Sequence, residues 1–211
     1  LKCNRYLWFS DRKKLPEISL SDKHKFSQGH DFEKYVYELF PTGVDLSGLD
    51  FFENLEKTQE AMKNINPIFE AGIQYEDYFV RVDILNPSGH GNWSLIEIKS
   101  TTEVKKHHIP DLAFQKFVCE KAGIKIDRCS VFYLDKYYVK EGLVDPKRLV
   151  TQEDVTEQVE LVEDVEKNAQ ASLAIIKKDD VPSITISPNC NKPHECPLKK
   201  ECWGTLPENN V

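Results

Sequence analysis

Two stretches in the middle of the chain alternate between apolar and polar residues, as half-buried β-strands do. They run from Tyr78 to Leu85 and from Trp93 to Ser100. The segment between them, Asn86-Pro87-Ser88-Gly89, is typical of a turn. This pattern predicts a β-hairpin, and side chains two residues apart on either strand should share one face of it.

The remaining elements follow from helical spacing and from further apolar runs. Helices are predicted over Ser27–Phe40, Asn54–Ile65, Asp111–Ala122 and Gln152–Lys177, strands over Pro67–Gln74 and Ile126–Tyr138, and a loop over Asp11–Phe26. Strands interspersed with helices predict an α/β fold with a central mixed β-sheet flanked by α-helices. The 211 residues, 40% of them hydrophobic, suit a single domain spanning 1–211.

The charged residues inside the predicted hairpin include Asp83, Glu97 and Lys99. Charges in a central strand are costly unless they are paired or bound to a metal. Two carboxylates can hold a divalent cation that polarises a phosphate and activates water, and a lysine can orient that water or neutralise developing charge. Taken alone, the motif is equally compatible with a solvated Glu–Lys ladder on half-exposed strands.

Charge and targeting patterns limit the possible partners. The net charge is −7, but much of the acid lies between Glu153 and Glu166, and a phosphate needs only a local basic surface. Three short basic stretches are candidates: Arg12-Lys13-Lys14, Lys23-His24-Lys25 and Lys105-Lys106-His107-His108.

The chain has neither an apolar run of membrane-spanning length nor a signal-peptide pattern, so we expect a cytoplasmic protein without a membrane partner. Because the chain begins with Leu and not with Met, the sequence leaves open whether a targeting segment has been removed.

The cysteines form a second constellation. Three of them, Cys190, Cys196 and Cys202, lie in the last 22 residues with five residues between neighbours, which fits short zinc-ligand pairs poorly. Together with the remote Cys3 they make four thiols, a set that suits a [4Fe–4S] cluster. Zinc is the alternative metal. Cys119 and Cys129, on a predicted helix and a predicted strand, are interpreted as small core residues.

These motifs resemble a known enzyme family. Asp83 followed by Glu97-Ile98-Lys99 resembles the D…(D/E)xK signature of the PD-(D/E)xK nuclease superfamily. The stretch GHDFEKYVYELF around His30, and Gln115 in DLAFQKFVCEKAG, are similar to motifs of its RecB-like branch, although Cys119 stands where a QxxxY-type motif has its tyrosine. The cysteine arrangement resembles the iron–sulfur members of that branch, including CRISPR-associated exonucleases and uncharacterised bacterial nuclease-like domains.

The resemblance implies a restriction-endonuclease-like core and a Mg²⁺- or Mn²⁺-dependent phosphodiesterase that cleaves DNA, as an exonuclease on single strands or ends. It implies that the metal ligands are His30, Asp83, Glu97 and the backbone carbonyl of Ile98. It also implies that Lys99 positions the water and that Gln115 contacts Lys99 or the phosphate. Glu70 would be a further carboxylate that supports the site or binds a second ion. It also implies that Cys3, Cys190, Cys196 and Cys202 hold a structural [4Fe–4S] cluster.

The cluster would join the segments 1–26 and 178–211 over a nuclease core of residues 27–177. Two alternatives from other classes remain. One is a catalytically idle nucleic-acid-binding module, and the other is a zinc-stapled interaction domain.

Overall fold

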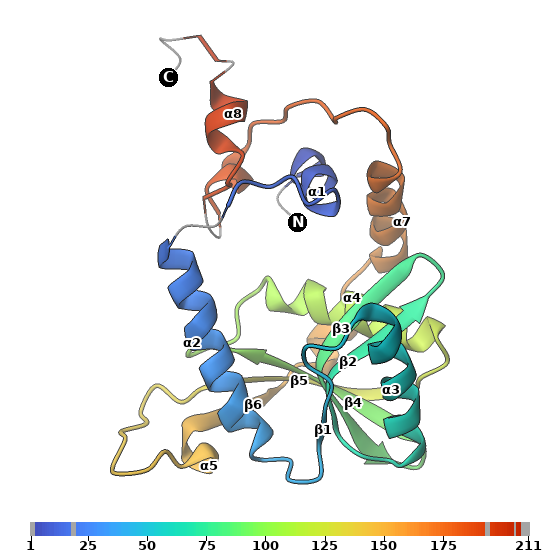
Figure 1. The fold of residues 1–211 in the computed structure, drawn as a ribbon, viewed down its shortest axis with the longest axis vertical. Coiled ribbons are helices and arrows are strands. Elements are labelled where there is room, and N and C mark those ends of the chain that lie inside the picture. Colours follow the sequence, from blue (N-terminus) through green and yellow to red (C-terminus); the bar gives the residue numbers. More distant parts are fainter. Residues whose placement is uncertain (1–2, 18–19, 193–194, 205, 208–211) are drawn as a thin grey trace. The chain divides into compact units, whose positions relative to one another are not determined.

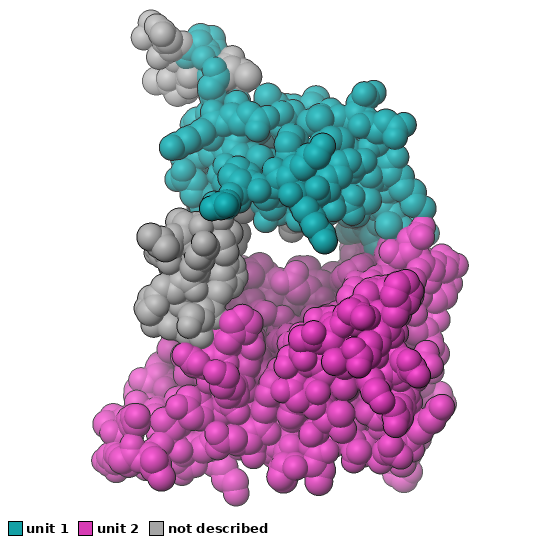
Figure 2. All heavy atoms as spheres, in the orientation of Figure 1, with its two compact units in different colours: residues 1–24, 167–211 teal, residues 25–166 magenta. Residues whose placement is uncertain are grey.

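The computed structural model describes residues 3–17, 20–192, 195–204 and 206–207, with residues 20–28 described by their backbone. The chain divides into two compact units (Figure 2). The central unit comprises residues 25–166, and the terminal unit comprises residues 1–24 together with 167–211. Among the described residues, no helix is both long and apolar enough to cross a membrane.

The central unit is built on a six-stranded mixed sheet whose strands follow one another in chain order (Figure 1). The strands are β1 (Val44–Asp45), β2 (Ile68–Tyr75), β3 (Tyr78–Gly89), β4 (Asn92–Lys99), β5 (Ile126–Leu134) and β6 (Val150–Asp154). The pairs β1–β2 and β4–β5 are parallel and the other three are antiparallel. The predicted α/β fold with a central mixed sheet and flanking helices is therefore confirmed.

Helices cover both faces of the sheet (Figure 1). They are α2 (Leu20–Tyr37), α3 (Phe51–Lys63), α4 (His108–Lys121), α5 (Pro146–Leu149) and α6 (Thr156–Glu160). Phe32 and Val36 of α2 pack with Ile84, Ile96 and Ile98 in one buried core. Because side chains alternate along a strand, the residues between these isoleucines face the opposite layer, where α4 lies.

The hairpin turn lies further along the chain than predicted. The tight turn is His90-Gly91, both in the left-handed region with φ of 54° and 77°, and Gly89 pairs with Asn92 across it. β3 therefore runs through Pro87, which pairs with Trp93 next to a register shift. Proline is tolerated in a strand at such an irregularity, so the Pro-Ser-Gly signal marks a bulge here and the predicted turn is wrong.

Two other predicted elements are wrong. The predicted loop over Asp11–Phe26 is helical from Leu20 onward, because the segment Leu20–Phe26 contains no proline or glycine that would stop the backbone of α2. The predicted helix over Gln152–Lys177 is divided into β6, α6 and α7 (Val165–Ile176). Thr156 begins α6 by donating its backbone N–H to the Asp154 carboxylate at 3.0 Å, and Asp164 adopts a φ of 58° between the two helices.

The terminal unit joins the two ends of the chain. It contains α1 (Asn4–Asp11), most of α7, η1 (Pro188–Cys190) and α8 (Lys199–Trp203). Trp8 donates its indole N–H to the carbonyl of Lys178 at 2.8 Å, and the same carbonyl accepts from Arg12 at 2.7 Å. Arg5 forms an ion pair with Glu201 at 2.5 Å. Helix α1 is thus held by residues more than 160 positions away.

Candidate functional site

Three carboxylates lie in one row across three neighbouring strands of the central unit. Glu70 on β2 lies opposite Asp83 on β3, between the pairs Phe69–Ile84 and Ala71–Val82. Asp83 in turn lies opposite Glu97 on β4, one position beyond the last regular β3–β4 pair. The register therefore places Glu70, Asp83 and Glu97 side by side, at the point where regular strand pairing is interrupted.

Asp83 occupies this interruption. Its Oδ2 accepts a hydrogen bond from the backbone N–H of Ile98 at 2.7 Å. Burial, and next the neighbouring carboxylate of Glu97, raise the pKa of Asp83 well above its usual value. Two like charges in a desolvated position favour either protonation or a bound cation. The pair Asp83–Glu97 therefore has the electrostatics of a cation site.

Glu97 is 5% exposed and is held from two sides. Its Oε1 pairs with the ammonium of Lys99, two residues along the same strand, as the strand alternation predicts. Its Oε2 accepts a hydrogen bond from Gln115 Nε2 on α4 at 2.7 Å. Gln115 thus contacts Glu97, whereas Lys99 or the phosphate was the expected partner. The carbonyl Oε1 of Gln115 is buried and has no donor among the described residues.

Lys99 is the cation of this group, and its side chain is partly exposed. Burial lowers the pKa of Lys99, but Glu97 and Asp83 together raise it further, so the net shift is upward. The lysine is therefore held firmly as an ammonium ion. A permanent positive charge between two carboxylates and solvent can neutralise charge on an incoming phosphate.

Glu70 has an unusual backbone that the sequence does not signal. Its φ is 56°, a left-handed value inside a strand, and its carbonyl accepts from the buried side chain of Asn54 at 2.9 Å. Burial first, and then Glu33, raise the pKa of Glu70. Burial and then Glu70 also raise the pKa of Tyr37, whose ring stacks on Phe69 at 4.0 Å. Glu33 and Asp45 thus form an acidic margin at the Glu70 end of the row.

His30 lies beside this margin. Its Nδ1 is 3.0 Å from Glu33 Oε2, its side chain is exposed, and its charge lowers the pKa of Glu70. A Cβ at the preceding Gly29 would lie 3.9 Å from Ser100 Oγ, so this turn of α2 approaches the end of β4. The structure therefore brings Asp83, Glu97, Ile98, Lys99 and Gln115 together and places His30 next to Glu70.

Helix α4 contributes Asp111, which sequence reasoning missed, and it buries His108, which was predicted only as part of a basic stretch. Asp111 lies one turn before Gln115, and burial followed by the charge of Glu97 raises the pKa of Asp111. His108 is 2% exposed, its Nδ1 accepts the backbone N–H of Lys105 at 3.2 Å, and burial lowers its pKa to about 4. The i, i+4 spacing of Asp111 and Gln115 was the available signal for Asp111.

The three basic stretches have different surroundings. His108 faces inward while Lys105, Lys106 and His107 are exposed. Arg12 donates to the carbonyls of Ile176 and Lys178, so it has a structural role in the terminal unit. The side chains of Lys23-His24-Lys25 lie outside the described part of the chain.

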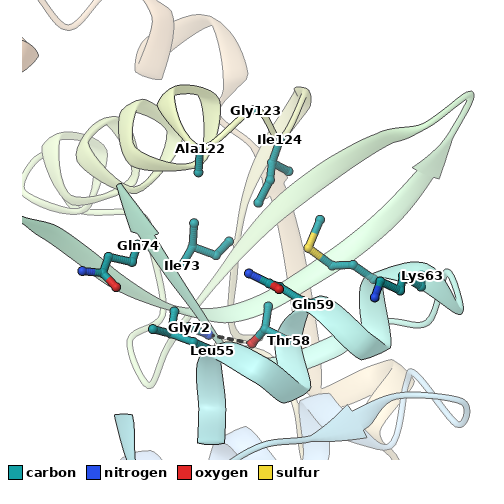
Figure 3. A pocket seen from close by; sticks show the side chains of 11 residues that line it. Leu55, Thr58, Gln59, Lys63, Gly72, Ile73, Gln74, Ala122, Gly123 and Ile124 are labelled. Atoms are coloured by element: carbon teal, nitrogen blue, oxygen red, sulfur yellow. Dashed lines mark hydrogen bonds between the residues drawn. The ribbon is translucent and has the colours of Figure 1, made fainter. Parts of the chain in front are cut away.

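A pocket of about 520 Å³ lies elsewhere in the central unit (Figure 3). It is formed by α3, β2 and the turn after α4, and Thr58 on its wall accepts the backbone N–H of Gly72 at 3.1 Å. Its lining carries one charged side chain, Lys63, and no carboxylate or cysteine. The pocket therefore contains none of the predicted site residues and none of the groups that metal-assisted chemistry needs.

The four cysteines of the predicted cluster all belong to the terminal unit. Cys3 caps α1, and its Sγ accepts the backbone N–H of Tyr6 at 3.4 Å. Cys196 donates its backbone N–H to the carbonyl of Cys190 at 2.8 Å. Burial raises the pKa of Cys202, and Cys196 and Cys3 raise it further, so these thiols lie within electrostatic range of one another. Cys119 and Cys129 are fully buried in the central unit, as predicted.

Within the described part of the chain, no group of three or more His, Cys, Asp or Glu side chains stands close enough together to hold a metal ion. The row therefore offers a metal ion one pair of carboxylates, those of Asp83 and Glu97. The described cysteines of the terminal unit lie near one another, but no three of them are close enough together to bind one ion.

No family model matches this chain, and a search of curated proteins finds no match either.

Proposed function

We propose that this chain is a divalent-cation-dependent DNA nuclease of the PD-(D/E)xK superfamily, in its RecB-like branch with an iron–sulfur cluster. The observation that carries the proposal is the buried carboxylate pair Asp83–Glu97 with Lys99 and Gln115 bonded to Glu97. A solvated surface ladder would leave Glu97 exposed, and Glu97 is buried. On this basis the central unit is a restriction-endonuclease-like core.

The residues fit Mg²⁺ or Mn²⁺. Magnesium is commonly bound through one or two carboxylates, with water and substrate phosphate completing the coordination. Asp83 and Glu97 supply these two carboxylates. The buried carbonyl Oε1 of Gln115, which accepts no hydrogen bond from the described residues, is a further oxygen on the helix that contacts Glu97. His30 and the Ile98 carbonyl are proposed as further ligands. When bound, the ion would polarise a phosphate and lower the pKa of a water ligand.

The other residues have distinct roles in this proposal. Gln115 orients the Glu97 carboxylate, because its amide N–H donates to one oxygen and leaves the other for Lys99. Lys99 supplies a fixed positive charge at the reacting phosphate and holds the attacking water. Glu70, whose raised pKa shows a desolvated setting, supports the acidic side of the row or receives a second ion.

The cysteines fit an iron–sulfur group by their donor chemistry. Four thiols come from one compact unit, and two buried N–H donors of that unit, Arg5 Nε and Trp203 Nε1, have no acceptor among the described residues. Sulfides and cysteinyl sulfurs of a cluster accept such N–H groups. Cys3, Cys190, Cys196 and Cys202 would hold the cluster, whose role is to cross-link both ends of the chain.

Cleavage of end-labelled DNA tests the proposal directly. The protein should degrade single-stranded or duplex oligonucleotides with Mn²⁺ and lose this activity with EDTA. Glu97→Gln removes one ligand charge and should abolish cleavage, while Glu163→Gln, an exposed acidic residue of the same unit, should cleave like the wild type. Equal cleavage by the Glu97→Gln variant would refute the assignment.

A further inference from the structure

The loop between β5 and α5 displays three large apolar side chains to solvent. Tyr137 is 80% exposed, Val139 is 64% exposed and Leu143 is 94% exposed. A short loop with so much exposed apolar surface is uncommon on a soluble monomer and marks a contact site.

This loop is held in place. Asp135 accepts the backbone N–H of Tyr137 on its carboxylate at 2.7 Å and that of Tyr138 on its carbonyl at 3.1 Å. The hydroxyl of Tyr138 accepts the backbone N–H of Asp145 at 3.1 Å, and Tyr138 and Val144 pack against the buried core of the sheet. The loop therefore folds around Tyr138 and holds the neighbouring Tyr137 outward.

One cation lies beside the exposed ring, and further cations are exposed nearby in the sequence. Lys136 Nζ lies 5.0 Å from the centroid of the Tyr137 ring. Lys140, Lys147 and Arg148 are also exposed. Three acids lie in the same stretch, Asp135, Glu141 and Asp145, and the carboxylates of Asp135 and Asp145 each accept a backbone N–H group. An aromatic platform with cations beside it is the usual surface for single-stranded nucleic acid.

The loop leaves the sheet beside the carboxylate row. Lys99 at the end of β4 pairs with Tyr133 on β5, and Leu134 donates its backbone N–H to the carbonyl of Thr101 at 2.9 Å. Tyr137 is four residues beyond Tyr133, so its Cα lies at most about 14 Å from the Cα of Tyr133. Both parallel strands end at this edge (Figure 1), so a nucleic-acid strand bound at Lys99 could reach the loop.

We propose that Tyr137 is a base-stacking platform for single-stranded nucleic acid, with Lys136 and Lys140 contacting the adjoining phosphates. This proposal extends the proposed nuclease function by assigning its strand-binding surface. A protein partner would also fit the exposed apolar side chains. It would not explain the lysine beside the Tyr137 ring, nor the position of the loop next to the end of β4, where Lys99 lies.

Fluorescence anisotropy with a labelled single-stranded oligothymidylate, in EDTA so that no cleavage occurs, tests the platform. Tyr137→Ala should weaken binding about 5- to 100-fold, as expected for loss of one stacked base, and Tyr137→Trp should retain the affinity. Phe52→Ala is the matched control, because Phe52 is an equally exposed aromatic (80%) on α3 of the same unit, and it should bind like the wild type. Replacing Lys136 and Lys140 by Ala should reduce the slope of log affinity against log salt by about one to two.

The outcomes separate this inference from the nuclease assignment. Wild-type protein that binds the oligonucleotide through Tyr137 but never cleaves it would support the platform and refute the nuclease. Cleavage with Mn²⁺ combined with unchanged binding by Tyr137→Ala would refute the platform alone, and would favour a protein partner for this loop. Failure of the wild-type protein to bind the oligonucleotide would also overturn the platform.

Discussion

The carboxyl group of Asp83 accepts the backbone N–H of Ile98 at 2.7 Å, so an acidic side chain joins β3 and β4 where their regular pairing has stopped. Burial and Glu97 raise the pKa of Asp83, which means that its ionised form is less stable in the folded protein than in the unfolded chain. The strand ends here are thus held in a state that a cation would stabilise.

Asp83→Asn should therefore raise the melting temperature of the metal-free protein at pH 7. Because the folded pKa exceeds the unfolded value near 3.9, the destabilisation of the wild type develops as pH rises above that value. The difference between the two proteins should accordingly shrink as pH falls towards 4. Thermal melts in EDTA across this range measure it, and saturating Mn²⁺ should stabilise only the wild type. A wild type that melts with or above Asp83→Asn at pH 7 in EDTA would contradict the prediction.

Gln115→Ala should slow cleavage while leaving the protein folded. The amide donates to the buried Glu97 carboxylate, and a hydrogen bond to a charged group contributes about 1.5–3 kcal/mol. We expect about a 10- to 100-fold loss in kcat with little change in KM, because Glu97 is misoriented and no substrate contact is lost. Glu120→Gln, an exposed change on the same helix, is the control. An unchanged kcat would mean that Gln115 only fills space beside Glu97.

Lys99→Met should separate catalysis from metal binding. Removal of an oriented charge at a reacting phosphate typically reduces the rate by about 10²–10³-fold. The ion ligands remain, so Mn²⁺ affinity measured by calorimetry should be equal to or higher than that of the wild type, because a nearby positive charge is gone. Wild-type cleavage rates by Lys99→Met would remove the lysine from the mechanism.

Two glycine substitutions should change stability in opposite directions. A Cβ at Gly72 would lie 1.9 Å from Oδ1 of the buried Asn54, which also holds the Glu70 carbonyl, so Gly72→Ala should cost about 2–3 kcal/mol of unfolding free energy. Gly29→Ala has its nearest neighbour at 3.9 Å and lies within α2, where alanine should be neutral or stabilise by up to about 1 kcal/mol. Urea unfolding of both variants measures this, and a neutral Gly72→Ala would show that Asn54 can move.

Cys3→Ser should have the same effect on the cofactor as Cys196→Ser or Cys202→Ser. Anaerobically purified wild-type protein should contain about four irons and four sulfides and show brown absorbance, and each of these three variants should lose both. Cys119→Ser and Cys129→Ser should keep the colour, because both residues are buried in the central unit, where burial raises the pKa of each thiol to about 12. A content of one zinc and no sulfide per chain would show that the cysteines bind zinc and would refute the cluster.

Periodicity predicted the elements that carry a continuous apolar stripe, such as β3, β4 and α4. It failed at β6, because valines at 155, 159 and 162 suit a helix, while the actual end of the strand depends on the local Asp154–Thr156 hydrogen bonds. It also could not reveal the left-handed Glu70, whose carbonyl accepts a hydrogen bond from Asn54 on a different element. The pair Asp83–Glu97 was predictable because strand alternation and register together fix its place. For Asp111 the sequence offered only the i, i+4 spacing from Gln115, and its place near Glu97 depends on where α4 packs.

The contacts of α1 impose an order on folding during synthesis. Trp8 and Arg12 both bond to the carbonyl of Lys178, about 170 residues later in the chain. At about 5–20 residues per second, the ribosome adds Lys178 roughly 10–30 s after Trp8. In that interval the whole of residues 25–166 is made and can fold, while α1 has none of these partners. The terminal unit can therefore form only after residues 25–166 have been synthesised, and translation itself delays the meeting of Cys3 with the other three cysteines.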